Sequence, residues 1–316
     1  MQIQPPEKNT DYFKMSDGFN LFYRRWQSSG QADRVVIFLH GIEVHSGAFR
    51  FMGPELANSN CEVYGFDRRG FGNSKEQDLP RGDVKSFERH LEDIDEVVEA
   101  VHKNHPGKKI FMFGHSIGCA YALWYAAHYP QQIDGLILAS NPLEAGFKVP
   151  TQDTIKLVFS PIIEHHSMYD LIDKWPQAFR EGEEYKLITE DELCTKVFGL
   201  GFLFELQTKL ANKMLHYASK IEKPTLLIHG NADIIALPES SNKLMEKLAS
   251  NDKNLQMFPG ADHWLYQSII PTMSSKYTLE QKKQVSNAVK IWLEKQATGS
   301  AMGLGETASA QKNTEK

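Results

Sequence analysis

A serine, an aspartate and a histidine that are far apart in this chain have the types and the order needed for nucleophilic catalysis. Ser116 is the central residue of a G-x-S-x-G motif, and Asp233 and His263 each follow an apolar segment further along the chain. In such a set, the histidine takes the proton of the serine hydroxyl and the aspartate orients the imidazole. The sequence therefore predicts Ser116 as the nucleophile, His263 as its base and Asp233 as the acid behind the base.

The segments around Ser116 predict the geometry that this motif requires. Residues 110–113 are bulky and uncharged, which is typical of a buried strand, and residues 119–127 are small and aromatic, which is typical of a buried helix. Gly114 and Gly118 allow strand and helix to approach, while the sharp turn holds the hydroxyl above the sheet. Two other interpretations are disfavoured: a chance motif, because strand and helix flank it, and a membrane span, because the motif would break it.

Two backbone N–H groups are predicted to form an oxyanion hole. One belongs to Ile117, directly after the nucleophile; the other belongs to Ile42, which follows His40-Gly41 after the predicted strand 34–39. Both residues would act through the backbone, where negative charge develops on the carbonyl oxygen of a substrate. His40 is predicted to be a structural hydrogen-bonding residue of this loop and not a base.

Other acidic residues offer alternatives for the acid. Asp262 is adjacent to His263, so its side chain should point away from the imidazole. Asp67 and Glu144 also end predicted strands and are weaker candidates. Asp233 is favoured because it follows a late strand in a glycine-containing loop, in the order expected for this machinery.

Paired histidines could also indicate a metal site. His102 and His105 could share one face of a helix, but no third ligand is evident, and the adjacent His165 and His166 should point apart. We therefore expect no metal and no cofactor.

Short apolar segments alternate with helical segments along most of the chain. This alternation predicts an α/β fold with a mostly parallel central sheet and helices on both faces. Catalytic groups in such sheets gather at the carboxyl ends of the strands. The predicted strands after an opening hairpin span residues 34–39, 62–66, 110–113, 134–140, 224–229 and 254–258.

Residues 143–219 interrupt this alternation and predict a helical cap inserted between two parts of the core, 1–142 and 220–297. Thr189 and Glu192 have capping-box spacing, and Gly199 and Gly201 are expected to separate two helices. The second helix would place an apolar stripe on the core or in a pocket, and the apolar run 157–163 could meet lipid. The stripe consists of Leu203, Leu206, Leu210, Met214 and Tyr217.

Composition excludes several classes of protein. The chain has 316 residues, of which 41% are hydrophobic, enough for a packed core, and its net charge of −5 argues against a nucleic-acid partner. Three scattered cysteines favour a reducing, cytoplasmic location, and no secretion signal is visible at the start. Residues 298–316 have almost no large apolar side chain and are predicted to be a disordered tail.

These motifs together resemble the α/β-hydrolase superfamily, and within it the monoglyceride lipase and lysophospholipase group. The likeness extends over about residues 12–295 and is carried by His40-Gly41 with residues 45–47, by residues 66–74, by residues 114–118 and by the loops of Asp233 and His263. The resemblance implies a serine esterase with a helical lid, an acyl-enzyme intermediate and no cofactor. It also implies a small-molecule acyl ester as substrate and peripheral contact of the cap with a membrane or micelle.

The likeness is incomplete at the positions that would contact the substrate head group. Where monoglyceride lipases usually carry a glutamate, an arginine and a later polar residue, this chain has Val44, Ala48 and Tyr266. Head group and chain length therefore stay open. The alternatives are a short-chain esterase, thioesterase or peptidase with the same triad, and, in another class, a catalytically idle binding module.

Overall fold

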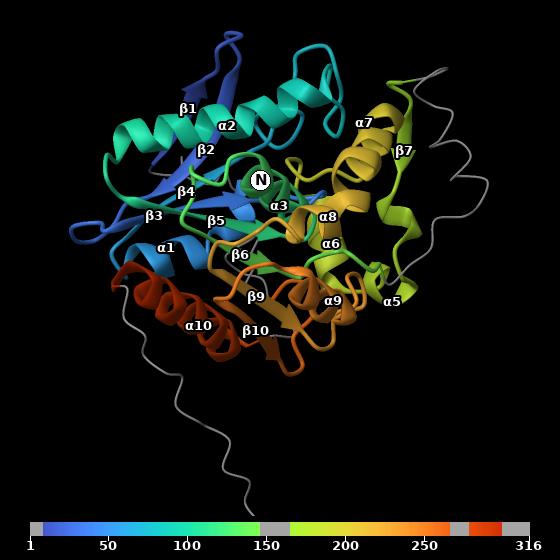
Figure 1. Ribbon diagram of the computed structural model, residues 1–316. Coiled ribbons are helices and arrows are strands. Elements are labelled where there is room, and N and C mark those ends of the chain that lie inside the picture. Colours follow the sequence, from blue (N-terminus) through green and yellow to red (C-terminus); the bar gives the residue numbers. More distant parts are fainter. Residues whose placement is uncertain (1–8, 146–164, 266–277, 299–316) are drawn as a thin grey trace, which may run out of the picture.

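The computed structural model describes residues 9–145, 165–265 and 278–298, and its centre is an eight-stranded sheet (Figure 1). The strand order is β1-β2-β4-β3-β5-β6-β9-β10. β1 pairs with β2, and β2 pairs with β4, in antiparallel fashion, whereas the six strands in the order β4-β3-β5-β6-β9-β10 run parallel to one another. The predicted fold class is thus confirmed. The strands are β1 (Thr10–Lys14), β2 (Asn20–Trp26), β3 (Arg34–Leu39), β4 (Cys61–Phe66), β5 (Lys109–His115), β6 (Gly135–Ala139), β9 (Thr225–Gly230) and β10 (Lys253–Phe258).

The central strands are uniformly apolar because both faces of the sheet are covered. In β3, Val35 and Ile37 belong to one hydrophobic core, while Val36 and Phe38 belong to a second core on the opposite face. Side chains alternate along a strand, so a strand buried on both sides needs no polar positions.

Helices from distant parts of the chain close the two faces. The smaller core contains residues of α1 and α10, and the larger core contains residues of α2, α3, α8 and α9. Figure 1 shows α1 and α10 together below the sheet, with α2 and α3 on its other side. The helices are α1 (Met52–Ala57), α2 (Phe87–Asn104), α3 (Gly118–His128), α8 (Met214–Ala218), α9 (Glu239–Lys247) and α10 (Leu279–Thr298).

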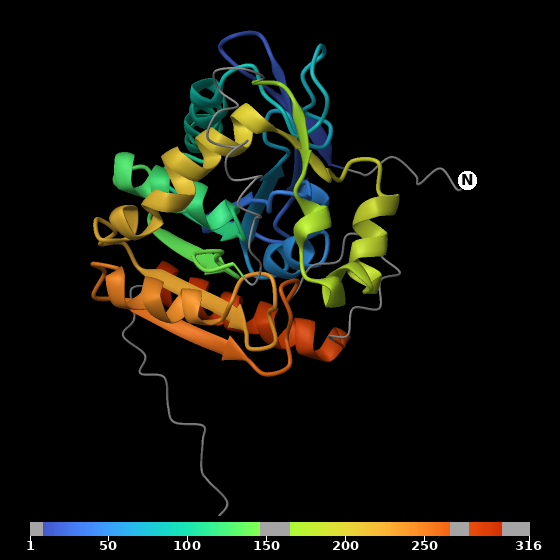
Figure 2. The same cartoon turned by 90° about the vertical axis from the view of Figure 1, so that its right-hand side faces the viewer.

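The described part of the cap lies beyond the carboxyl ends of the parallel strands. In Figure 1 the strand arrows point toward the side occupied by β7, α5, α6 and α7, and Figure 2 shows this side from the front. Two short strands pair here, so the cap is not purely helical. The cap elements are β7 (Met168–Asp170), α5 (Gln177–Arg180), α6 (Glu183–Glu190), β8 (Val197–Gly199), α7 (Leu200–Glu205) and a π-helical turn (Leu206–Leu210), followed by α8.

Two local predictions for the cap are wrong. Thr189 does not begin a helix: it lies inside α6, and its hydroxyl donates a 2.7 Å hydrogen bond back to the Lys186 carbonyl. The two glycines do not separate helices either, because Gly199 ends β8 and Gly201 lies inside α7. Their small size serves packing instead. A Cβ on Gly199 would lie 2.2 Å from the Asp83 carboxylate.

The predicted apolar stripe of the cap packs on the core. All five of its residues are buried within the larger hydrophobic core, although the π-helical turn breaks the segment into short helices. Tyr266, the run 157–163 and the tail 299–316 lie outside the described residues. None of the helices in the described ranges has the length and apolar character needed to cross a membrane.

Candidate active site

Ser116 lies in a strained turn between β5 and α3, at the carboxyl end of a central strand. Its φ is 53°, in the left-handed region that costs a non-glycine residue about 1 kcal/mol or more. The neighbouring glycines make this turn possible. A Cβ on Gly114 would lie 2.5 Å from the Gly118 carbonyl, and one on Gly118 would lie 2.1 Å from the Leu39 carbonyl. The serine is thus held at a point where strand and helix nearly touch.

The loops after β9 and β10 bring Asp233 and His263 together. The Nδ1 of His263 donates a 2.8 Å hydrogen bond to Oδ2 of Asp233, and both side chains are buried. Burial alone would lower the pKa of His263, but the charge of Asp233 and this hydrogen bond outweigh it, so the pKa lies above its ordinary value. Such an imidazole is held in one tautomer, with Nε2 free of its proton when the ring is neutral.

Asp233 is anchored by further donors. Its Oδ1 accepts hydrogen bonds of 2.9 Å from the backbone N–H groups of Ile235 and Ala236. Burial would raise the pKa of Asp233, but the charge of His263 and the hydrogen bonds from His229 and His263 lower it well below its usual range. The carboxylate is therefore ionised over the pH range in which His263 titrates.

Two residues hold the backbone of His263 against the nucleophile turn. The Nε2 of His115 donates a 2.9 Å hydrogen bond to the His263 carbonyl, and Ser140 Oγ donates to the same oxygen at 3.1 Å. The two imidazole rings lie edge to face, with centroids 5.0 Å apart. Since His115 directly precedes Ser116, this contact brings His263 to the side of the nucleophile.

The hydrogen bond between the serine and the histidine is not formed. The Nε2 of His263 is buried and has no hydrogen-bond partner among the described residues. Catalytic hydrogen bonds are often long or absent without substrate and shorten when it binds. The structure thus joins Asp233 to His263 directly, and joins His263 to Ser116 through the neighbouring residues His115 and Ser140.

The predicted oxyanion loop is held by a buried arginine. Arg68 donates from its guanidinium to the carbonyls of His40 and Gly41, the latter at 3.0 Å. The His40 ring donates from Nδ1 to the Gly41 carbonyl at 2.7 Å and accepts at Nε2 from the Arg68 backbone N–H at 3.1 Å. His40 is therefore a structural hydrogen-bonding residue, as predicted. The Gly41 carbonyl points toward Arg68, to which it is hydrogen-bonded. Since the C=O and N–H groups of a trans peptide point in opposite directions, the N–H of Ile42 points away from Arg68.

Neither predicted oxyanion donor is used within the described part of the chain. The N–H groups of Ile42 and Ile117 donate to no acceptor among residues 9–145, 165–265 and 278–298. Ile117 stands at the start of α3, where unpaired N–H groups attract negative charge. Both groups are free to bind an oxyanion.

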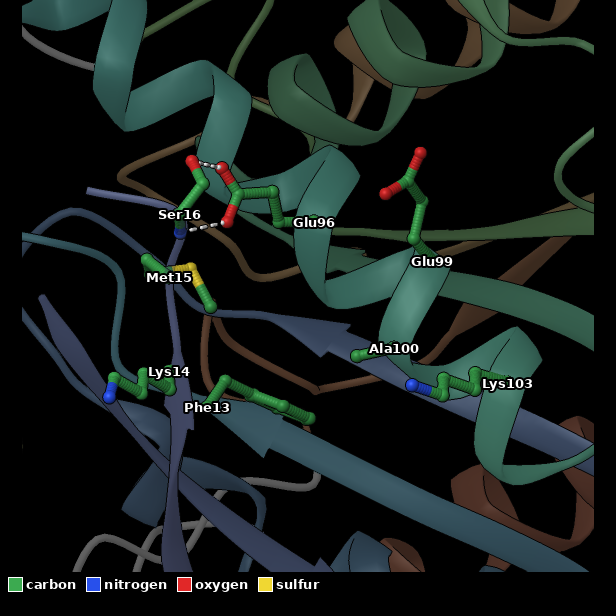
Figure 3. A pocket seen from close by; sticks show the side chains of 8 residues that line it. All are labelled: Phe13, Lys14, Met15, Ser16, Glu96, Glu99, Ala100 and Lys103. Atoms are coloured by element: carbon green, nitrogen blue, oxygen red, sulfur yellow. Dashed lines mark hydrogen bonds between the residues drawn. The ribbon is translucent and has the colours of Figure 1, made fainter. Parts of the chain in front are cut away.

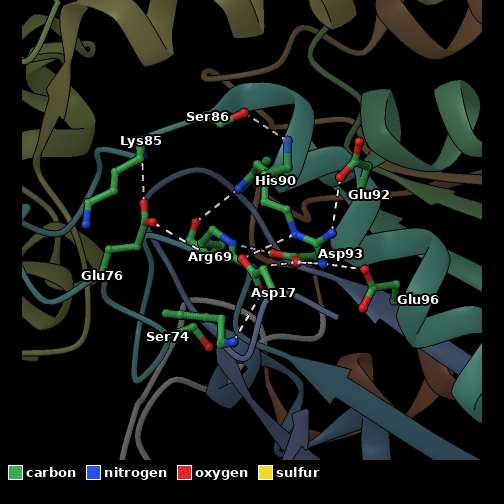
Figure 4. Close-up of polar contacts among 12 residues, drawn as sticks. Asp17, Arg69, Ser74, Glu76, Lys85, Ser86, His90, Glu92, Asp93 and Glu96 are labelled. Carbon is green, nitrogen blue, oxygen red and sulfur yellow. Dashed lines mark hydrogen bonds and ion pairs between the residues drawn. The ribbon is translucent and has the colours of Figure 1, made fainter. Parts of the chain in front are cut away.

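A network of ion pairs anchors the turn that carries Arg68 (Figure 4). Its neighbour Arg69 donates to both oxygens of Asp93 on α2, at 2.7 and 2.9 Å, and pairs with Asp17 at 3.0 Å. Arg69 and Asp93 are buried, so the two hydrogen bonds between them offset much of the desolvation of their charges. This network ties the loop after β4 to α2 and to the first hairpin.

The alternative acids are occupied elsewhere. Asp262 caps its own loop by accepting from the Trp264 N–H at 2.9 Å. Asp67 accepts from the N–H groups of Ser46 and Asn73, both at 2.8 Å. Glu144 pairs with Lys243. None of the three contacts His263 as Asp233 does.

The histidine pairs considered for metal binding have other partners. His102 donates to the Gln132 carbonyl at 2.9 Å, and His105 contacts the Tyr64 hydroxyl at 2.9 Å. His165 and His166 lie edge to face, and His166 is bound to Asp83 at 2.6 Å.

A different cluster joins the cap to the oxyanion loop. Ligand atoms of His45, Asp191 and Cys194 lie within 4.8 Å of one another. The Nδ1 of His45 accepts from the Gly47 N–H at 3.1 Å, so in the neutral ring Nε2 carries the proton and donates to Asp191 at 3.2 Å. This arrangement is a link between cap and core. The Thr195 N–H adds a second link, a 2.7 Å hydrogen bond to the Glu43 carbonyl.

Two residues of the site were missed by sequence reasoning. His229 lies at the end of β9, with its Nε2 3.2 Å from Asp233 Oδ2. Glu43 is fully buried directly after Ile42. The only signal for Glu43 was an acidic residue between the apolar residues Ile42 and Val44, and nothing local distinguished His229 from the other histidines.

A surface groove lies between β1 and α2 and is separate from this site. It measures about 480 Å³ and is bounded on one side by Glu96, which accepts hydrogen bonds from the backbone and hydroxyl of Ser16 (Figure 3). None of the predicted catalytic residues lines it.

The sequence and the fold of this chain are similar to those of known lipases. Residues 30–267 match the family model described as serine aminopeptidase, S33. The monoglyceride lipase of Homo sapiens is 28% identical over 279 residues, which cover 86% of this chain and 89% of that protein. The monoacylglycerol lipase of Mycolicibacterium smegmatis is 23% identical, over 79% of this chain and 88% of that protein. The crystal structure of Paleococcus ferrophilus monoacylglycerol lipase matches with a TM-score of 0.73 and 26% identity, over 87% of this chain and 99% of that one.

Proposed function

Because the chain belongs to the serine aminopeptidase S33 family and is an α/β-hydrolase of the monoglyceride lipase type, we propose that it cleaves single-chain acyl esters through an acyl-enzyme on Ser116. Serine ester hydrolysis is the chemistry shared by its relatives. Monoacylglycerols or lysophospholipids are the substrates that we propose. The observation that carries the proposal is the buried His263–Asp233 pair, held by His115 beside a serine in a strained turn.

The proposed reaction uses these residues in two stages. His263 takes the proton of Ser116 at Nε2, and the serine oxygen attacks the ester carbonyl carbon. The oxyanion accepts hydrogen bonds from the N–H groups of Ile42 and Ile117, each worth about 3 kcal/mol in the transition state. Asp233 stabilises the imidazolium, which then protonates the leaving alcohol. Water deprotonated by His263 releases the fatty acid in the second stage.

The experiment that tests this proposal combines labelling with hydrolysis. A fluorophosphonate probe should label the wild-type protein at Ser116, and Ser116→Ala should lose both labelling and hydrolysis of p-nitrophenyl esters by at least 10³-fold. Ser286→Ala is a matched control, because Ser286 is fully buried on α10, away from the site. Equal turnover by Ser116→Ala and wild type would refute the assignment, whereas absence of labelling at Ser116 in the folded wild-type protein would favour an idle binding module.

The family description favours one second candidate, the hydrolysis of aminoacyl amides. The same triad would attack an amide, so rates with acyl esters of increasing chain length and with aminoacyl amides separate the two activities. We expect esters with long acyl chains to be preferred.

We further propose that the cap approaches substrate aggregates and that the protein works in the cytoplasm. Met168 and Val197, on the paired strands β7 and β8, are exposed apolar residues of the cap. Binding of the protein to vesicles of neutral lipid, compared between wild type and the double variant Met168→Ser and Val197→Ser, tests the contact.

A further inference from the structure

An ionisable side chain next to the proposed nucleophile has no role in the mechanism described above. Glu43 is fully buried, and neither of its carboxylate oxygens has a hydrogen-bond partner among the described residues. A buried carboxyl group without a hydrogen-bond partner lowers the stability of the folded protein. Its presence at this position therefore suggests a functional role. Glu43 is one residue past the oxyanion donor Ile42, and its backbone carbonyl is fixed by the cap through Thr195.

The distances around Gly41 show where the Glu43 carboxylate lies. A Cβ built on Gly41 would lie 3.5 Å from each of three atoms: Glu43 Oε2, His115 Nδ1 and Ser116 Cβ. The carboxylate, the nucleophile and the imidazole of His115 therefore surround one point. Since the ring of His115 lies against that of His263, with centroids 5.0 Å apart, Glu43 lies on the side of the base that faces His115 and Ser116.

The charges around His263 come from four loops. Asp233 follows β9, and Asp262 directly precedes His263. His115 ends β5, and Glu43 follows β3. The nearest further groups are His229, which acts on Asp233, and Lys282, which acts on Asp262. Burial lowers the pKa of His115 to about 3, so that ring is neutral. After Asp233, Glu43 is the next negative group that raises the pKa of His263.

Glu43 itself faces two positive groups. The pKa of Glu43 lies above its ordinary value because burial outweighs the charges of His263 and Arg68, which lower it. An anion at this place would repel the oxyanion, but Arg68 holds the other side of the same loop and offsets that repulsion.

We propose that Glu43 is a second, electrostatic positioning residue for the base, whose carboxylate favours the imidazolium form of His263 in addition to Asp233. Glu43 touches neither the acyl group nor the oxyanion in this proposal, and it acts only through His263. The inference rests on the proposed function, because it assumes that His263 is the base of Ser116.

The test is the pH dependence of Ser116 labelling by a fluorophosphonate, which needs no knowledge of the natural substrate. Labelling requires neutral His263, so the rate falls on acidification through the pKa of that residue. Removing a nearby negative charge lowers this pKa, so Glu43→Gln should move the midpoint of the acid limb about one pH unit lower. Glu43→Asp should restore part of the difference. Glu62 is a buried glutamate of β4 that pairs with Arg25 of β2, so Glu62→Gln should leave the midpoint unchanged.

The possible results separate the inference from the function on which it rests. Absence of labelling at Ser116 in wild type would overturn the proposed function. Normal labelling with the same acid midpoint in Glu43→Gln and wild type would overturn the inference alone, whether or not the melting temperature changes. An unchanged midpoint with a raised KM for esters would instead assign Glu43 to the leaving group, and would also overturn it. If Glu43→Gln does not fold, Glu43→Asp carries the test through a smaller shift in the same direction.

Discussion

At the scale of single residues, the carboxylate of Asp233 is the most constrained group of the site. It accepts from two backbone N–H groups and lies within hydrogen-bond distance of two imidazoles, His263 and His229. Asp233→Asn should keep this geometry but stabilise the wrong tautomer of His263, lowering kcat about 10⁴-fold. Asp262→Asn is the matched control, and a comparable loss in that variant would move the role of the acid to position 262. Steady-state kinetics with a soluble ester measure both.

The raised pKa of His263 predicts the pH range of activity. The base must be neutral to accept the serine proton, so activity disappears as pH falls through the pKa of His263 in the folded protein. Because Asp233 raises this pKa above its ordinary value of 6.5, the acid limb of kcat/KM should have its midpoint above pH 6.5. A midpoint clearly below 6.5 in wild type would contradict the charge environment described here.

At the scale of elements, close backbone contacts make particular glycines irreplaceable. Gly118→Ala would place a Cβ 2.1 Å from the Leu39 carbonyl, so strand β3 and helix α3 would have to separate. We expect a loss of more than about 3 kcal/mol in unfolding free energy. Gly107→Ala, at a positive φ but with open space around it, should cost only about 1 kcal/mol. Denaturant unfolding of both variants checks the contrast, and equal losses would contradict it.

The attachment of the cap to the core is another property of elements. The link between His45 and Asp191 is partly buried and joins the oxyanion loop to the segment after α6. Asp191→Asn should weaken it by about 1 kcal/mol, increase hydrogen exchange in residues 191–195 and lower kcat/KM. Asp173→Asn, an exposed cap carboxylate, should change neither. Identical exchange in the two variants would show that the link does not hold the cap.

At the scale of the whole molecule, the division of the chain into a core, an inserted cap and a tail is a prediction that remains to be tested. Removal of residues 299–316 should leave the melting temperature and ester hydrolysis unchanged, because that stretch has almost no large apolar side chain in its sequence. A loss of stability on truncation would assign the tail a structural contact. Differential scanning calorimetry and the ester assay measure both quantities.

The sequence alone determined the parallel sheet and the identity of the candidate catalytic residues. Strands buried on both faces are continuously apolar, and a serine turn needs its flanking glycines, so both features leave local patterns. The cap was harder to predict from the sequence. Gly199 and Gly201 are needed for close packing against Asp83 and His165, and no local sequence pattern reveals such contacts.

Only the tertiary structure decided which charges share the site. His45 and Asp191 are separated by 146 residues, and Glu43 becomes a neighbour of Ser116 and His263 only when three loops meet at one edge of the sheet. Burial and charge pairing depend on what surrounds a group in space. Sequence order therefore predicted a candidate nucleophile, base and acid, whereas folding determined the electrostatic environment of the candidate base.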